Sequence, residues 1–163
     1  MTELECAAQE TAALLLAKGL TVSLAESCTG GMIAAALVGC PGVSDVFLEG
    51  CVSYSNAAKM RTLQVKEETL QKEGAVSAQC ALEMVQGICH YSHSDTGLSV
   101  TGIAGPGGGT REKPVGLVYM GASCKGRERV EYRVFAGDRQ AVRTQAAVFA
   151  LRMLNSMLSE QGE

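Results

Sequence analysis

Apolar and polar residues recur along this chain with two different spacings. Apolar residues three or four positions apart are typical of one face of a helix, whereas short, mostly apolar runs between turn residues are typical of buried strands. By this criterion helices are expected over Leu4–Lys18, Gly30–Val38, Asn56–Leu63, Lys66–Glu73, from the N-cap Ser77 to His90, and from the cap Asp138 onward. Strands are expected over Thr21–Ala25, Phe47–Tyr54, Thr96–Thr101, Val115–Cys124 and Arg129–Phe135.

The order of these elements predicts the fold. Strands and helices alternate in the first part of the chain, while the last two strands flank Lys125-Gly126, a turn signal for an antiparallel hairpin. The residues expected to face the core are Ala81, Met84, Val85 and Ile88 in one helix and Val142, Ala146, Phe149, Met153 and Met157 in the last. We therefore expect an α/β protein, a three-layer α/β/α sandwich with a mixed β-sheet, formed by residues 1–163 as a single domain.

Composition narrows the functional classes. The chain has 163 residues, of which 47% are hydrophobic and 19% charged, which is typical of a globular protein. A net charge of -3 and only 4% aromatic residues argue against nucleic acid or an anionic membrane as the partner. The seven cysteines are irregularly spaced and form no C-x-x-C motif, which fits a reducing cytoplasm better than a disulfide framework. We expect a soluble, cytoplasmic protein.

A glycine-rich loop is the most informative segment. Residues 101–110 read T-G-I-A-G-P-G-G-G-T and follow the apolar strand ending at Thr101. Glycine at this density lets backbone N–H groups approach a ligand, so a loop of this kind at a strand end can wrap an anionic or amide-bearing small molecule. The alternative is a mobile hairpin connection that binds nothing.

A second candidate segment, Ala25-Glu26-Ser27-Cys28-Thr29-Gly30-Gly31, lies between an expected strand and an expected helix. A serine at such a junction can attack a carbonyl group while nearby backbone N–H groups stabilise the oxyanion. Two alternatives stay open at this point. Ser27 or Thr29 could only cap the helix, and Cys28 is a rival nucleophile because the helix dipole would also favour a thiolate.

The third segment, Tyr54-Ser55-Asn56-Ala57-Ala58-Lys59, passes from a strand end into a helix. A buried lysine whose pKa is lowered can serve as the base for a serine nucleophile, and the spacing lets the Tyr54 phenol and the Lys59 ammonium converge. The alternative is a capped surface helix with a solvated lysine. The chain has only two histidines, His90 and His93, and these fit a helix C-terminus better than a metal site.

The fourth segment begins the last helix. Arg139 and Arg143 are four residues apart, so one helix face presents both guanidinium groups near its N-terminus. Two such groups can clamp a phosphate. The alternative is an exposed basic edge paired with Asp138 or Glu128.

Taken together, these segments resemble the CinA C-terminal domain family, the nicotinamide-nucleotide amidohydrolases. The matching pieces are A-E-S-C-T-G-G, Y-S-N-A-A-K, G-A-V-S (Gly74 to Ser77), T-G-I-A-G-P-G-G-G-T, K-P-V-G and G-D-R, in the family's order from about Leu20 to Leu154. Larger CinA proteins carry a further domain ahead of this one, so the chain is similar to the stand-alone form.

The resemblance implies an activity and a set of residues. The activity is hydrolysis of the carboxamide of nicotinamide mononucleotide to nicotinic acid mononucleotide and ammonia, a step of pyridine-nucleotide salvage. The implied catalytic residues are Ser27, Lys59 and Tyr54, in an α/β/α homodimer without metal or cofactor. Thr29, Gly30 or the Gly102 loop would hold the oxyanion. The residues expected to bind the substrate are Thr29, Gly30, Thr101, Gly102, Ala104 and Gly105, with Arg139 and Arg143 as phosphate ligands proposed from charge and position. A nucleotide-binding module without turnover is the alternative.

Overall fold

The protein is described here by a computed structural model covering residues 1–160. Its centre is a five-stranded sheet in the order β2-β1-β3-β4-β5. The strands are β1 (Val22–Glu26), β2 (Phe47–Val52), β3 (Thr96–Gly102), β4 (Leu117–Cys124) and β5 (Arg127–Val134). β1 runs parallel to β2 and β3, whereas β4 is antiparallel to both β3 and β5. The expected mixed sheet, with its late hairpin, is confirmed.

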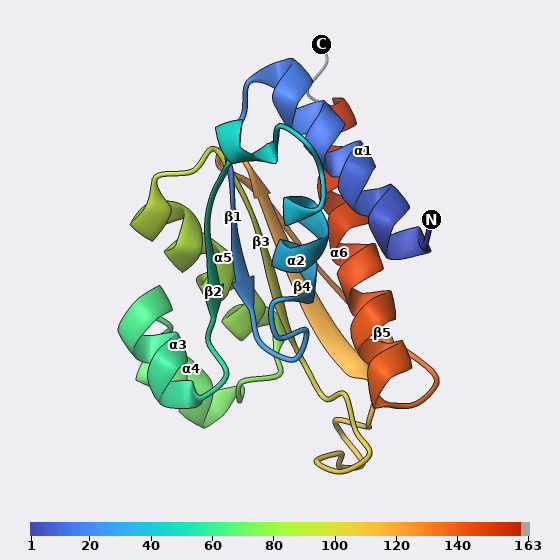
Figure 1. The fold of residues 1–163 in the computed structure, drawn as a ribbon. Coiled ribbons are helices and arrows are strands. Elements are labelled where there is room, and N and C mark those ends of the chain that lie inside the picture. The colour runs from blue at the N-terminus through green and yellow to red at the C-terminus, as the bar shows by residue number, and fades with distance from the viewer. Residues whose placement is uncertain (161–163) are drawn as a thin grey trace.

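Helices cover both faces of the sheet, as the three-layer prediction requires (Figure 1). One face carries α1 (Glu3–Lys18), α2 (Met32–Val38) and α6 (Arg139–Glu160), while the other carries α3 (Asn56–Leu63), α4 (Glu67–Lys72) and α5 (Ala78–Ser92). A short 3-10 helix, η1 (Val43–Asp45), precedes β2. Every expected helix and strand is present, and the observed ends differ from the expected ones by at most two residues.

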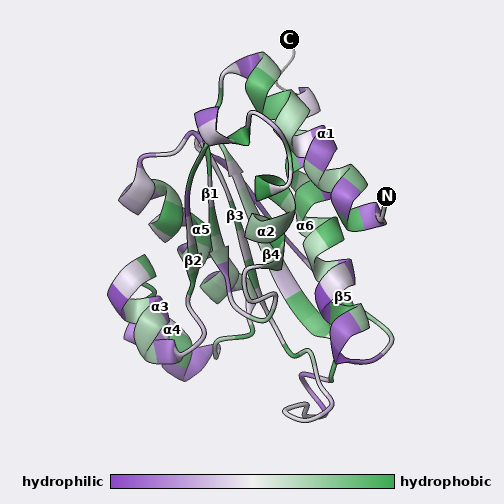
Figure 2. Cartoon of the chain, viewed as in Figure 1, coloured by the Kyte–Doolittle hydropathy of each residue, from purple (hydrophilic) through white to green (hydrophobic). Residues whose placement is uncertain are grey.

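Burial explains why the layers form. β1 and β3 are buried along almost their whole length, as strands covered on both faces must be. The four expected inward residues of α5 are fully buried, and those of α6 are buried except Phe149, which is half-buried. In Figure 2 the central strands are mostly white to green, whereas purple stretches lie on α1, on α3 and α4, and on the loop that follows β3. Among residues 1–160, no helix is long and apolar enough to cross a membrane.

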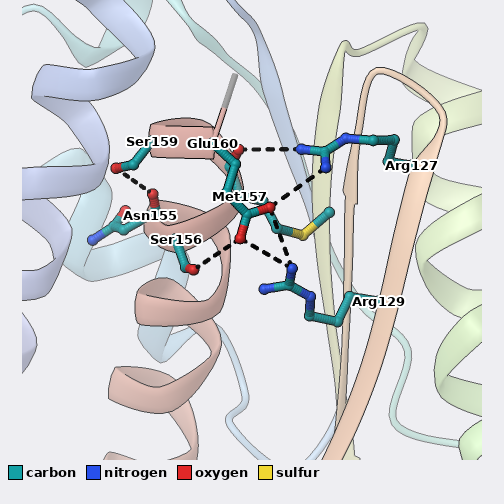
Figure 3. A network of polar contacts seen from close by, with 7 residues as sticks. All are labelled: Arg127, Arg129, Asn155, Ser156, Met157, Ser159 and Glu160. Atoms are coloured by element: carbon teal, nitrogen blue, oxygen red, sulfur yellow. Dashed lines mark hydrogen bonds and ion pairs between the residues drawn. The ribbon is translucent and has the colours of Figure 1, made fainter. Parts of the chain in front are cut away.

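Polar contacts fix the C-terminal end of α6 against β5 (Figure 3). The Glu160 carboxylate accepts hydrogen bonds from Arg127 and Arg129 at 3.2–3.4 Å, and Arg127 also donates to the Met157 carbonyl. These side chains are 36–49% exposed, so solvent screens each ion pair and its contribution to stability is small. The other end of α6, which carries Arg139 and Arg143, lies at the candidate site.

Candidate active site

The site forms where β1 and β3 end side by side. Ser27 directly follows β1, and its backbone N–H donates to the Val100 carbonyl of β3 at 3.0 Å. Ser53, just after β2, donates its N–H to the Glu26 carbonyl at 2.9 Å. Because the carboxyl ends of parallel strands lie at one edge of a sheet, these bonds fix Ser27 and the Ser53 carbonyl beside each other.

Lys59 reaches this edge from the first turn of α3. Its Nζ lies 3.1 Å from the Ser27 Oγ and 2.8 Å from the Ser53 carbonyl oxygen. Lys59 is 2% exposed and Ser27 8% exposed, so the pair is removed from solvent. The helix is capped, since the Ser55 hydroxyl accepts from the Ala58 N–H, but the lysine is buried. The solvated-lysine alternative is therefore wrong.

Burial lowers the pKa of Lys59 below the ordinary value for lysine. The thiols of Cys80, Cys28 and Cys51 would oppose this shift only if they were ionised. Burial raises the pKa of Cys28 and Cys80 to about 11, so these two thiols are neutral at neutral pH and supply no counter-charge. Within residues 1–160, no carboxylate forms an ion pair with Lys59. Burial thus shifts the equilibrium toward the uncharged amine relative to an exposed lysine, and it is the uncharged form that can accept a proton from Ser27.

The raised pKa of Cys28 also bears on the rival nucleophile. A thiol attacks as the thiolate, and burial disfavours that form here despite the nearby Arg143 and Lys59. Cys28 is 5% exposed and lies beside Ser27, but Lys59 Nζ hydrogen-bonds the Ser27 Oγ, and the described residues show no such bond to the Cys28 thiol. The position of the base therefore favours Ser27.

A buried carboxylate, not Ser27 or Thr29, caps α2. Glu26 is 2% exposed and accepts hydrogen bonds from the N–H groups of Gly31, Ile33 and Ala34 at 2.9–3.2 Å. The Ser27 hydroxyl contacts Lys59, and the Thr29 hydroxyl is buried with no hydrogen-bond partner. The capping interpretation of both residues is therefore wrong. Sequence reasoning missed Glu26, although an acidic residue just before a helix start was an available signal.

The turn after Ser27 leaves one donor free for an oxyanion. The Gly30 N–H is already bound to the Ser27 carbonyl at 3.0 Å, the Gly31 N–H to Glu26, and the Cys28 N–H faces its own thiol. In the part of the chain that the structure describes, the backbone N–H of Thr29 has no acceptor. Of the two turn positions expected to hold the oxyanion, Thr29 therefore retains a free N–H and Gly30 does not.

Tyr54 lies at the site, but its phenol does not contact the lysine. Lys59 Nζ is 3.5 Å from the Tyr54 carbonyl oxygen, whereas the Tyr54 hydroxyl accepts a hydrogen bond from Arg139 Nη2 at 2.9 Å. Tyr54 is 60% exposed. The expected convergence of phenol and ammonium is thus replaced by a backbone contact, with the ring at the rim.

The two arginines of α6 bind the protein's own carbonyls. Arg139 donates to the Gly105 carbonyl at 2.7 Å, and Arg143 donates to the Cys28 and Thr29 carbonyls at 2.9 and 3.1 Å. Neither pairs with Asp138 or Glu128 in the described residues, so the basic-edge alternative is wrong. Asp138 instead accepts from the Ala141 N–H at 2.8 Å, which confirms it as a cap. Both guanidinium groups therefore brace loops of the site.

These segments enclose a cavity of about 190 Å³, with space for roughly six waters at about 30 Å³ each. The lining residues are Ser27, Cys28, Tyr54, Asn56, Lys59, Ala75, Val76, Thr101 and Gly102. Sequence reasoning missed Asn56, Ala75 and Val76 as lining residues, although all three belong to motifs that it had noted. The other expected substrate ligands, Thr29, Gly30, Ala104, Gly105, Arg139 and Arg143, lie outside the lining.

The described residues contain no group of three or more histidine, cysteine or acidic side chains that could hold a metal ion. His90 lies in the last turn of α5, and His93 caps that helix in the left-handed conformation. Their position is the helix C-terminus expected from the sequence.

Comparison with known proteins identifies the family. The model of the CinA C-terminal domain matches residues 4–158. A CinA-like protein of Kosmotoga olearia is 53% identical over 145 residues, which are 89% of this chain and 35% of that protein. A CinA-like protein of Fusobacterium nucleatum is 52% identical over 144 residues, 88% of this chain and 35% of that one. The chain thus spans about a third of the length of the curated relatives it matches.

Solved structures agree with the sequence match. A CinA superfamily protein of Klebsiella pneumoniae is 36% identical with a TM-score of 0.93, covering 96% of this chain and 98% of that one. A competence/damage inducible protein of Agrobacterium tumefaciens is 41% identical, also with a TM-score of 0.93, covering 98% and 97%. The chain belongs to the CinA C-terminal domain family.

Proposed function

We propose that this protein hydrolyses the carboxamide of nicotinamide mononucleotide, with Ser27 as the nucleophile and Lys59 as the base. The observation that carries the proposal is the buried Lys59 Nζ, 3.1 Å from the Ser27 Oγ with its pKa lowered by burial. A hydroxyl and an uncharged amine at this distance form a nucleophile and its base without histidine.

In the first half of the reaction, Ser27 Oγ attacks the amide carbon while its proton moves to Lys59 Nζ. The negative charge on the carbonyl oxygen is held by the free backbone N–H of Thr29. Lys59 then returns the proton to the amide nitrogen as the carbon–nitrogen bond breaks. Ammonia leaves, and the acyl group remains as an ester on Ser27.

In the second half, water attacks the ester carbon and gives a proton to Lys59. The bond to Ser27 Oγ breaks, and Lys59 hands the proton back to that oxygen. Nicotinic acid mononucleotide is released and the free enzyme is restored. Lys59 acts as base and acid in each half, which requires a pKa nearer to the working pH than that of an exposed lysine.

The small size of the cavity supports a substrate of which only one end, the pyridine carboxamide, enters it. The pyridine carboxamide occupies the 190 Å³ beside Ser27, and the ribose phosphate extends past Tyr54 toward α6. There Arg139 and Arg143 keep N–H groups beyond those bound to protein carbonyls, to the Tyr54 hydroxyl and to the Gln140 side chain, and these would bind the phosphate. The family resemblance adds a homodimer in the cytoplasm to the proposal.

Ammonia release from nicotinamide mononucleotide tests the proposal. Ser27→Ala should lower kcat/KM by about a thousandfold or more, on the order of 4 kcal/mol of transition-state stabilisation. Ser44→Ala, at an exposed serine of η1, is the matched control and should be fully active. No ammonia from the wild-type protein, or equal rates for both variants, would count against hydrolysis. Tight nucleotide binding without ammonia, undiminished in Lys59→Ala, would instead favour a binding module.

A further inference from the structure

We propose that Lys113 is a positioning residue that latches the glycine-rich loop to a wall of the cavity and thereby retains the substrate. The inference rests on the proposed function for its kinetic part only. Lys113 belongs to K-P-V-G, a motif that the catalytic account leaves without a role. It lies in the segment between β3 and β4, 103–116, which leaves the sheet at the edge where Ser27 and Lys59 lie (Figure 1).

The loop is built as a hinged flap. At its base, the Ile103 N–H donates to the Leu117 carbonyl at 2.9 Å and the Gly116 N–H donates to the Ile103 carbonyl at 2.8 Å. Toward its tip, Thr110 and Lys113 close a turn: each backbone N–H donates to the other residue, at 2.7 and 3.0 Å. Residues 106–112, which run from beyond this base into the turn, are exposed. The flap therefore has a fixed base, a closed turn and a solvent-facing stretch.

Two cationic side chains hold this flap from opposite directions. Arg139, at the start of α6, donates to the Gly105 carbonyl at 2.7 Å. Lys113 Nζ donates to the Glu73 carbonyl at the end of α4, on the other side of the sheet edge. A Cβ atom at Gly74 would lie only 2.9 Å from that Nζ, and Gly74 has a φ of +82°. Glycine at this position therefore leaves room for the Lys113 side chain to reach the Glu73 carbonyl.

The segment that receives the latch forms a wall of the cavity. Ala75 and Val76 line it, as do Thr101 and Gly102 at the end of β3, from which the loop leaves. The Thr101 hydroxyl donates to the Ala75 carbonyl at 2.8 Å, so the base of the loop and the segment that receives the latch are also tied beside the cavity. Lys113 thus ties the loop to a segment that lines the cavity, and it touches neither Ser27 nor Lys59. Its loss should free the loop and weaken substrate retention while the reacting pair stays in place.

The test compares Lys113→Met and Lys113→Arg with Lys125→Met, which removes the same charge at the exposed turn between β4 and β5. Trypsin reports on the loop without any substrate, because Arg111 lies on the exposed stretch while cleavage after a lysine at 113 is blocked by Pro114. Lys113→Met should be cut after Arg111 about tenfold faster than the wild type, since proteolysis follows the open population. Lys113→Arg and Lys125→Met should be cut at the wild-type rate.

Kinetics of ammonia release supply the second readout. Lys113→Met should raise KM for nicotinamide mononucleotide by roughly tenfold and change kcat less than about twofold. Lys113→Arg should restore KM, because guanidinium can donate to the same carbonyl. Wild-type cleavage of Lys113→Met overturns the latch, even if the wild-type protein releases no ammonia. Faster cleavage with an unchanged KM, or a loss confined to kcat, overturns the role in substrate retention.

Discussion

Replacing Lys59 by methionine should change how stability depends on pH, whatever it does to activity. Lys59 is 2% exposed and lacks a carboxylate partner among residues 1–160, and burial lowers its pKa below the ordinary value. In the unfolded chain its pKa returns to about 10.4. Between the lowered folded pKa and this unfolded value, the folded protein has released the proton and the unfolded chain still holds it. Raising the pH through that window therefore stabilises the wild-type fold.

The size of this pH dependence follows from the single proton that Lys59 holds in the unfolded chain and has released in the folded protein. Within the window, the free energy of unfolding of the wild type should rise relative to Lys59→Met by up to about 1.4 kcal/mol per pH unit. The stability is fully present above the unfolded pKa and is lost as the pH falls through the folded one. Urea denaturation of both proteins from near-neutral pH to about pH 10 measures the difference in their free energies of unfolding. Because all other groups titrate in both proteins, their contributions cancel in this difference. Lys125→Met is the exposed control and should show no such slope. A wild-type minus Lys59→Met difference that is flat over this range would refute a lowered Lys59 pKa.

Three further substitutions have defined outcomes. Glu26→Gln replaces a buried carboxylate that accepts three backbone hydrogen bonds, so it should lower the free energy of unfolding by about 2 kcal/mol in urea denaturation, and wild-type stability would contradict its capping role. Gly87→Ala would normally strengthen a helix, but its Cβ would lie 1.9 Å from the Leu63 carbonyl oxygen of α3. It should therefore destabilise the protein by about 1–3 kcal/mol and lower ammonia release by displacing α3; a raised melting temperature would show that the helices separate freely. Cys28→Ala should keep most of the activity because burial raises the pKa of that thiol to about 11, and a loss as large as that of Ser27→Ala would restore Cys28 as the nucleophile.

The sequence was a good guide to the elements and to the pair of reacting side chains. Periodicity placed every α-helix and strand of the described residues, though not the 3-10 helix η1, because apolar residues follow the burial of each layer, and the motif order brought Ser27 and Lys59 to the same sheet edge. What periodicity could not supply was the direction of side chains at the rim. The Tyr54 phenol accepts a hydrogen bond from Arg139, and the residue contacts Lys59 only through its backbone carbonyl.

The sequence also left open which acceptor takes the N–H groups at the start of α2. Ser27 and Thr29 have the right chemistry for a helix cap, but Glu26 is one residue earlier and a carboxylate accepts several N–H groups at once. The arginines of α6 were predicted as phosphate ligands from charge alone, while the structure gives them the carbonyls of Gly105, Cys28 and Thr29. Their contact with a phosphate stays a prediction.

The pH dependence of kcat/KM for nicotinamide mononucleotide, measured for the wild type and for Lys59→Arg, tests the pairing of Ser27 with an uncharged amine most directly. The wild-type rate should rise with pH along a limb whose midpoint lies below the ordinary pKa of lysine, because only the free amine can take the Ser27 proton. Lys59→Arg keeps the charge and cannot give it up, so both the limb and the activity should disappear. Ammonia release by Lys59→Arg at the wild-type rate, along an unchanged limb, would contradict the account.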